Sequence, residues 1–276
     1  MLESLLPSSV ISVETRDDRL DVELLPEEER ALGRAVDKRR REFTTGRACA
    51  RAALARLGVP STAVGSGRHG EPLWPSGVVG SITHCEGYRA CAVASACAVV
   101  AIGIDAERDA RLSDGVWTQV ARGRERDLRG ATTSSVRGGP HLDAVLFSAK
   151  EAVYKAWFPL TRRQLGFDDV EVSLDLMNAA FSAKLLVRGP VVNGENLSEF
   201  RGRWALEEGV ICTAVIVPAS DRPAPARQAV LDARSKSFAR VGTDVYRARR
   251  PPSLDPLIAC RRHPHVGGPV LGTLPC

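Results

Sequence analysis

Hydrophobic and polar positions repeat at helical spacing in two long segments of the chain. In residues 35–57 the apolar positions form one stripe, and Gly58 followed by Pro60 predicts where this helix ends. Residues 142–160 show the same period, and a shorter helix is predicted near 116–128. The predicted strands are 10–15, 78–83, 89–94, 98–104, 170–176, 181–187, 202–206 and 210–217. This order of elements predicts an α+β fold and hints at a duplicated unit of one helix and several strands.

Two short stretches carry the candidate chemistry. Asp105 and Glu107 close the apolar strand at 98–104 and are two residues apart, so on a strand both carboxylates point to the same side. Glu151 and Lys155 are four residues apart and therefore share one face of the second long helix. Three carboxylates beside lysines suit a hard divalent cation that also binds phosphate oxygens. The pattern predicts a phosphate-bearing substrate together with Mg²⁺.

Simpler interpretations remain open for each of these features. A Glu and a Lys at this spacing often form a solvated pair on a surface helix, and acidic residues often mark a strand end. His84 follows the strand at 78–83, where a lone histidine is more often structural than a ligand. The helix at 35–57 also has a basic face, which is either solvated or binds anions, because guanidinium groups clamp phosphate bidentately. This face consists of Arg39, Arg40, Arg41, Arg47 and Arg51.

Composition limits the class of protein. The chain has 276 residues, 44% of them hydrophobic, which is enough for a core, and no apolar run approaches the length of a membrane span. The first residues lack the basic start and apolar block of a secretory signal. Seven cysteines without a CxxC pair argue against a zinc knuckle or a disulfide framework. We therefore expect a cytoplasmic protein with no membrane partner.

The net charge of +5 is unevenly distributed. Residues 219–276 contain ten Lys or Arg and four acids, whereas the remainder of the chain is nearly neutral. The basic pI therefore gives no reason to expect nucleic-acid binding by the folded part. The same segment is rich in proline and lacks sustained periodicity, so it is predicted to be a disordered tail.

The motifs together resemble one family, the Sfp/EntD-type 4′-phosphopantetheinyl transferases, and in particular its EntD-like actinomycete branch. The first family hallmark appears as IGIDAE at 102–107 and the second as FSAKEAVYK at 147–155, in the expected order and about the expected separation. Further similarity covers 46–60, 70–94, 155–167 and 201–204, so the resemblance extends over roughly residues 35–217. Either hallmark alone would be weak, whereas the two together are specific.

The resemblance implies an activity. Coenzyme A would donate its 4′-phosphopantetheine arm to a serine of an acyl or peptidyl carrier protein, with release of 3′,5′-ADP. The reaction would use Mg²⁺, with Mn²⁺ as a possible substitute, and would serve polyketide, nonribosomal peptide, siderophore or lipid synthesis. The implied fold is a pseudo-dimer of two similar α/β halves, residues 1–103 and 104–218, followed by the tail at 219–276. A monomer would already contain the whole cleft.

The resemblance also implies roles for individual residues. Asp105, Glu107 and Glu151 would bind the metal, Glu151 would act as the base for the serine hydroxyl, and Lys155 would stabilise charge in the transition state. Arg68 stands where some relatives carry a lysine, so its match is the least secure. The residues that match coenzyme A contacts are Arg39, Arg47, Arg68, Gly70, Glu71, Pro72, His84, Lys150 and Lys155.

Three other functions remain to be separated from transfer. A coenzyme A-binding or nucleotide-binding protein without transfer activity would share the arginine helix and His84 but would not need Glu151. A Mg²⁺-dependent phosphohydrolase would use water in place of the serine. A nucleic-acid-binding role would have to rest on the tail at 219–276 alone.

Overall fold

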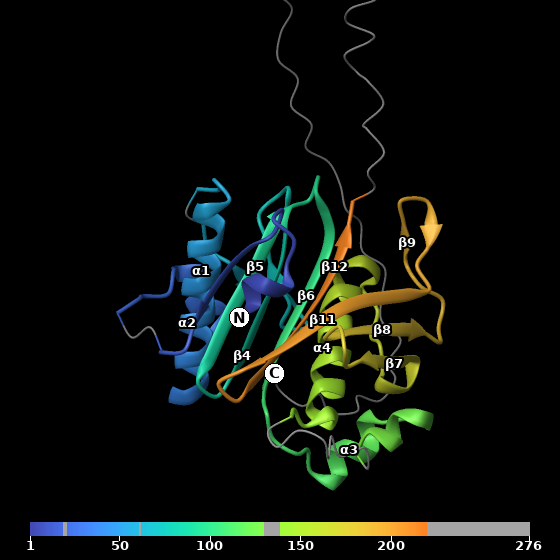
Figure 1. Ribbon diagram of the computed structural model, residues 1–276. Coiled ribbons are helices and arrows are strands. Elements are labelled where there is room, and N and C mark those ends of the chain that lie inside the picture. The colour runs from blue at the N-terminus through green and yellow to red at the C-terminus, as the bar shows by residue number, and fades with distance from the viewer. Residues whose placement is uncertain (19–20, 61, 130–138, 220–276) are drawn as a thin grey trace, which may run out of the picture. The chain divides into compact units, whose positions relative to one another are not determined.

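The computed structural model describes residues 1–18, 21–60, 62–129 and 139–219. The predicted disordered tail, apart from Ala219, lies outside these residues. The described chain contains two antiparallel sheets of three and five strands, each with one long helix packed against it (Figure 1). This confirms the predicted α+β class. No helix among the described residues is both long and apolar enough to cross a membrane.

The first half of the chain forms the three-stranded sheet, in the order β1-β5-β4. The helix α2 packs on this sheet through Cys49, Ala50 and Leu54, which meet Cys91 and Val93 of β5 in one buried cluster. A short hairpin of β2 and β3 follows α2. The elements are η1 (Leu2–Leu5), β1 (Ile11–Thr15), α1 (Pro26–Leu32), α2 (Asp37–Arg56), β2 (Gly65–Ser66), β3 (Pro72–Leu73), β4 (Val78–Cys85) and β5 (Tyr88–Ser95).

The second half forms the five-stranded sheet, in the order β6-β12-β11-β8-β7, with α4 packed across it. The helix predicted near 116–128 is instead two short pieces, because the chain is extended at Ala121 and Gly123 adopts a φ of 48°. The elements are β6 (Val99–Arg108), α3 (Asp114–Val120), η2 (Gly123–Arg129), α4 (Leu142–Thr161), η3 (Phe167–Asp169), β7 (Val170–Asp175), β8 (Ala180–Leu185), β9 (Val191–Val192), β10 (Glu195–Asn196), β11 (Glu199–Glu207) and β12 (Val210–Pro218).

The strand β6 is longer than predicted and has two different buried faces. Its pairing with β12 continues through Asp105 and Glu107, so both residues lie within the strand and not beyond its end. Ile102 and Ile104 point into the cluster that contains η1, whereas Ala101 packs into the cluster formed with α4. As predicted from the period of a strand, Asp105 and Glu107 share the face opposite Ala106.

Gly103 sets the distance between β6 and α4. A Cβ atom at this position would lie 1.9 Å from the Ala152 carbonyl oxygen and 2.7 Å from the Ala156 amide nitrogen. Only glycine allows two backbones to approach this closely. The helix segment that contains Glu151 and Lys155 is therefore seated directly on β6.

The two sheets meet where β4 packs against β6. The boundary expected at residue 103 falls inside β6, and all of β6 belongs to the five-stranded sheet because it pairs with β12. The turn at 96–98 separates β5 of the three-stranded sheet from β6 of the five-stranded sheet.

Candidate active site

The carboxylates predicted from the sequence lie on the face of β6 that α4 covers. Asp105 is buried, with 4% of its surface exposed. Its Oδ1 atom accepts hydrogen bonds from the Lys155 ammonium at 2.7 Å and from the Thr83 hydroxyl at 3.3 Å. Its Oδ2 atom is buried and has no hydrogen-bond partner among the residues that the structure describes. Such an oxygen is costly to bury unless a cation or a donor reaches it.

Glu107 and Glu151 share the electrostatic environment of Asp105. Burial raises the pKa of Glu107 to about 8, and the negative charges of Asp105 and Glu151 act in the same direction, while Lys155 opposes them. Glu151 is therefore close enough to Glu107 to affect its charge. Asp105 and Lys155 are therefore in direct contact where β6 meets α4, and the charges of Glu107 and Glu151 act on each other at the same junction.

These carboxylates fit a divalent cation that a substrate helps to hold. No three His, Cys, Asp or Glu side chains of the described chain form a group able to hold a metal ion by themselves. Mg²⁺ usually takes only one or two protein carboxylates and completes its shell with water and substrate phosphate. Asp105 Oδ2 is buried without a hydrogen-bond partner among the described residues, and neighbouring negative charges raise the pKa of Glu107. A bound cation would stabilise the negative charge of both carboxylates.

His84 lies at the same junction, near the end of β4. The Arg39 guanidinium on α2 lies 2.9 Å from His84 Nε2. Arginine can only donate, so Nε2 accepts and the ring proton is assigned to Nδ1. Burial lowers the pKa of His84 to about 3, and the positive charges of Arg39, Lys155 and Arg89 add to this effect. The histidine is therefore neutral at neutral pH, with a Glu42 carboxylate oxygen 3.8 Å from its Nδ1 atom.

The arginines of α2 do not form one continuous basic surface, as both interpretations of the sequence had assumed. Arg40 pairs with Glu29, and Arg51 pairs with the fully buried Glu28. Arg47 is 5% exposed and donates to Ser66 Oγ at 2.9 Å, which ties α2 to the β2–β3 hairpin. Burial lowers the pKa of Arg47 to about 10, so it remains charged at neutral pH. Most of these arginines therefore have structural partners.

Lys150 is buried and engaged by three acceptors of its own half of the chain. It is 3% exposed, and its ammonium donates to Glu125 at 2.7 Å, to the Val120 carbonyl at 2.8 Å and to the Phe167 carbonyl at 3.0 Å. An ammonium has three donors, and all three are used. Lys150 therefore anchors η2 and η3 to α4 in this structure, and its expected contact with a coenzyme A phosphate stays a prediction.

The remaining residues matched to coenzyme A lie in or beside the β2–β3 hairpin. Arg68 and Gly70 are exposed at its tip, and Pro72 begins β3. Glu71 is anchored, since it accepts from the His69 amide at 3.0 Å and from Arg162, just beyond α4, at 3.2 Å. The hairpin is therefore attached to both halves of the chain, through Arg47 of α2 and through Arg162 beyond α4.

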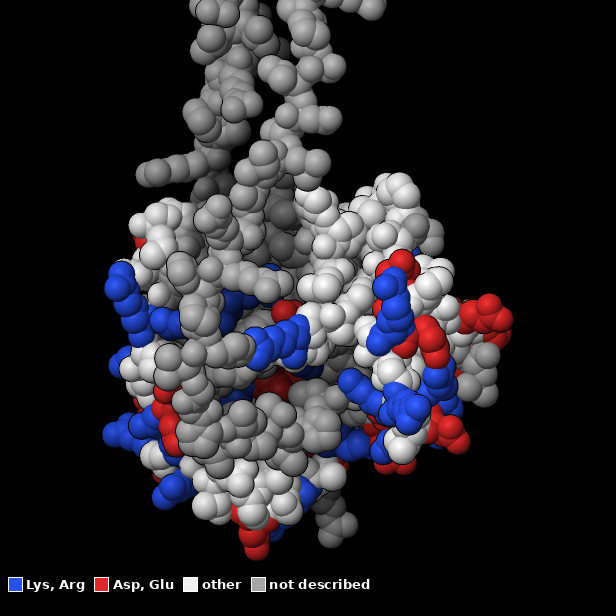
Figure 2. All heavy atoms as spheres, turned by 180° about the vertical axis from the view of Figure 1, so that it is seen from behind, with Lys and Arg blue, Asp and Glu red and all other residues white. Residues whose placement is uncertain are grey.

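Charge is segregated on the face seen from behind, where acidic side chains lie in a recess between lysine and arginine side chains (Figure 2).

Sequence reasoning missed two buried contributors to the site. Thr83 bonds to Asp105, and Glu42 faces His84. Thr83 could have been noticed because Ser81 and Thr83 place two hydroxyls on one face of a strand that leads into His84.

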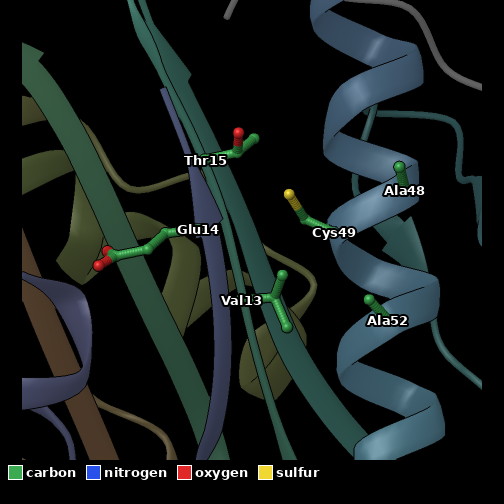
Figure 3. A pocket seen from close by; sticks show the side chains of 6 residues that line it. All are labelled: Val13, Glu14, Thr15, Ala48, Cys49 and Ala52. Carbon is green, nitrogen blue, oxygen red and sulfur yellow. The ribbon is translucent and has the colours of Figure 1, made fainter. Parts of the chain in front are cut away.

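A second cleft lies between β1 and α2, apart from the carboxylates of β6 (Figure 3). The Cys49 sulfur points from α2 toward β1, whereas Glu14 points away from the helix. Glu14 is engaged by the hydroxyl of Tyr88 and by the amide of Leu2. This cleft offers no convergent set of acid, base and cation, so it is not a candidate for the chemistry.

Two family models match the chain. Residues 27–94 match the 4′-phosphopantetheinyl transferase N-terminal domain, and residues 101–190 match the 4′-phosphopantetheinyl transferase superfamily. The first match contains α2 and His84, and the second contains α4 and β6 from residue 101 onward. The two matches therefore include the elements that form the candidate site.

Three curated relatives are similar over most of their length. The chain is 49% identical to the 4′-phosphopantetheinyl transferase Svp of Streptomyces mobaraensis, over 79% of this chain and 90% of that protein. It is 46% identical to Npt of Nocardia iowensis, over 78% and 99% of the two chains, and 41% identical to PptT of Mycobacterium tuberculosis, over 79% and 98%. Both relatives carry the same enzyme name. Because both family models match and three relatives are 41–49% identical, the chain belongs to the 4′-phosphopantetheinyl transferase superfamily, in the branch of its actinomycete members.

Proposed function

We propose that this protein transfers the 4′-phosphopantetheine arm of coenzyme A to a serine of an acyl or peptidyl carrier protein. The observation that carries the proposal is the convergence of Asp105 and Glu107 from β6 with Glu151 and Lys155 from α4, beside His84 of β4. Membership of the transferase superfamily supports coenzyme A as the donor and carrier proteins as acceptors.

The chemistry would proceed as follows. Glu151 takes the proton of the serine hydroxyl, and the serine oxygen attacks the phosphorus that carries the pantetheine arm. The bond between that phosphorus and the bridging pyrophosphate oxygen breaks, and 3′,5′-ADP leaves with the electron pair. A serine hydroxyl is a weak nucleophile near neutral pH, so a base is required. A carboxylate near cations is a weak base, so Glu151 would contribute chiefly through its placement.

Asp105, Glu107 and Glu151 would hold Mg²⁺, or Mn²⁺ in its place, together with the pyrophosphate. The cation supplies charge neutralisation of the pyrophosphate oxygens when it is bound. The Lys155 ammonium lies 2.7 Å from Asp105 Oδ1, and it would stabilise the charge that builds on the transferred phosphoryl group. Phosphoryl transfer asks a protein mainly for positioning and positive charge, which these residues would supply.

Arg39 and His84 would bind a phosphate of coenzyme A. Arg39 donates to His84 Nε2 at 2.9 Å, so each group holds the other in place. An incoming phosphate would compete for the Arg39 donors and would favour a protonated His84 that donates in turn. Arg47 and Glu71 would act through the hairpin at 65–73, which they anchor, and Arg68, Gly70 and Pro72 belong to the same hairpin.

We also propose that the two halves are related as a pseudo-dimer and that the protein acts as a monomer. Each half has an initial strand, then a long helix, then antiparallel strands that pack on that helix. The site draws residues from both halves of one chain, so no second copy is needed to complete it. Size-exclusion chromatography with light scattering should give the mass of a single chain.

The decisive test of transfer compares the protein with its Glu151→Gln variant on an apo carrier protein, with coenzyme A and Mg²⁺. Loss of carrier modification with coenzyme A binding retained would support transfer with Glu151 as the base. Unchanged activity would remove Glu151 from the mechanism. Binding without any transfer by the native protein would favour a non-catalytic binding role, and breakdown of coenzyme A without a carrier would favour a phosphohydrolase.

A further inference from the structure

The junction between the two sheets is bridged by side-chain hydroxyls. β4 packs against β6, but the two strands belong to different hydrogen-bonded sheets. Two buried amides of β6 donate to hydroxyls of β4, Ile104 to Ser81 Oγ at 3.2 Å and Ala106 to Thr83 Oγ1 at 2.9 Å. Both hydroxyl residues are almost fully buried, with 4% and 2% of their surfaces exposed. The hydroxyls therefore satisfy backbone donors that would otherwise be buried without a partner.

Thr83 differs from Ser81 because its hydroxyl also contacts Asp105. The Ala106 amide can only donate and the Asp105 carboxylate can only accept, so the direction of the chain of hydrogen bonds is fixed. Ala106 donates to the Thr83 oxygen, and the Thr83 hydroxyl donates to Asp105 Oδ1 at 3.3 Å. The Lys155 ammonium lies 3.5 Å from the same Thr83 oxygen. One hydroxyl thus contacts a backbone amide, a carboxylate and an ammonium of the candidate site.

This arrangement leaves the two oxygens of Asp105 in different states. Oδ1 is engaged by Thr83 and Lys155, whereas Oδ2 has no hydrogen-bond partner among the described residues. A carboxylate held through one oxygen by a fixed donor keeps its other oxygen in a defined direction. Partners of this kind orient metal-binding carboxylates and raise their affinity.

We propose that Thr83 is a positioning residue, whose hydroxyl links the Ala106 amide to Asp105 Oδ1 and so directs Asp105 Oδ2 toward the bound divalent cation. The inference rests on the proposed function, because it assigns Asp105 to the metal. It goes beyond that function in giving β4 a role in the metal site, in addition to the placement of His84. Thr83 acts through Asp105 and needs no contact of its own with the substrate.

The chain offers a matched control for this role. Thr83→Val removes the hydroxyl while keeping the shape, and Thr83→Ser keeps the hydroxyl. Ser81→Ala removes the neighbouring hydroxyl, which accepts from an equally buried amide but, in the part of the chain that the structure describes, does not hydrogen-bond to Asp105. Thr83→Val and Ser81→Ala should therefore both lower the melting temperature, because each leaves a buried N–H group without its partner.

The test is a titration of each protein with Mn²⁺ in the presence of coenzyme A and without any carrier, followed by the electron paramagnetic resonance signal of free Mn²⁺. We expect the Mn²⁺ Kd to rise by about tenfold in Thr83→Val, which is in the range for loss of a ligand-orienting partner. The Mn²⁺ Kd of Thr83→Ser and of Ser81→Ala should stay close to that of the native protein. If Thr83→Val does not fold, Thr83→Ala, which empties the space, takes its place.

Two results would overturn the inference. An unchanged Mn²⁺ Kd in Thr83→Val would show that the hydroxyl does not orient Asp105. An equal rise of the Mn²⁺ Kd in Ser81→Ala would show that Mn²⁺ binding depends on the packing of β4 against β6 in general, and not on the hydrogen bond from Thr83 to Asp105. The native protein is first assayed for transfer to an apo carrier, and failure there would contradict the proposed function itself, whatever the variants bind.

Discussion

Gly103→Ala tests how strictly the contact between β6 and α4 sets the site. The new Cβ atom would lie 1.9 Å from the Ala152 carbonyl oxygen, and 2.7 Å from the amide nitrogen of Ala156. A carbon and a carbonyl oxygen normally stay at least about 3.3 Å apart, so the two elements must separate by about 1.4 Å at this point. Both obstructing groups are backbone atoms, so no side-chain rotation can relieve the contact.

The consequence is both energetic and functional. Overpacking of a close contact typically costs about 1–3 kcal/mol, and a backbone obstruction of this size should reach the upper end of that range. Glu151 directly precedes Ala152 on α4 and Lys155 directly precedes Ala156, while Asp105 lies two residues after Gly103 on the same face of β6. A misplacement of about 1 Å between catalytic groups can cost roughly a hundredfold in rate, so we expect a loss of this order in carrier modification.

The assay combines urea unfolding with the initial rate of carrier modification, measured under conditions where the variant is fully folded. Gly115→Ala on α3 is the matched control, because no atom lies within 4 Å of its new Cβ and its φ is not positive. That control should retain activity and change the free energy of unfolding by less than about 1 kcal/mol. Native stability and native rate in Gly103→Ala would refute the claim that this contact sets the site.

Further variants test separate parts of the account. Glu151→Gln should lower kcat by about 10²–10⁴-fold while coenzyme A binding, measured by calorimetry, stays within a few-fold; a native kcat would exclude Glu151 as the base. Lys150→Met should lower the free energy of unfolding by about 3–5 kcal/mol, because it leaves Glu125 buried without its partner. Denaturant titration checks this, with Lys184→Met as the control at an exposed lysine. A Lys150→Met variant with native stability and a raised KM for coenzyme A would instead support a substrate-binding role for Lys150.

The residues of the two motifs could be predicted from sequence because their relation is local. Asp105 and Glu107 share a strand face through their spacing of two, and Glu151 and Lys155 share a helix face through their spacing of four. The long helices were predicted within two residues for the same reason, since their apolar periods are continuous. Whether the two motifs meet depends on Gly103, whose role is visible only in three dimensions.

Other features depend on contacts between residues far apart in the chain. Lys150 sits beside a motif glutamate, but its acceptor Glu125 lies 25 residues away, so its burial could not be predicted from spacing. The basic face of α2 looked continuous because the partners of Arg40 and Arg51 come from α1. The strand β6 runs past its apolar segment because β12, about a hundred residues later, supplies its backbone partners.

The central claim is tested most directly by the intact mass of an apo carrier protein after incubation with the purified protein, coenzyme A and Mg²⁺. We expect the carrier to gain the mass of one phosphopantetheine unit. The gain should disappear with EDTA and when the acceptor serine of the carrier is changed to alanine. A folded protein that binds coenzyme A but adds no mass to acyl or peptidyl carriers would contradict the proposed transfer.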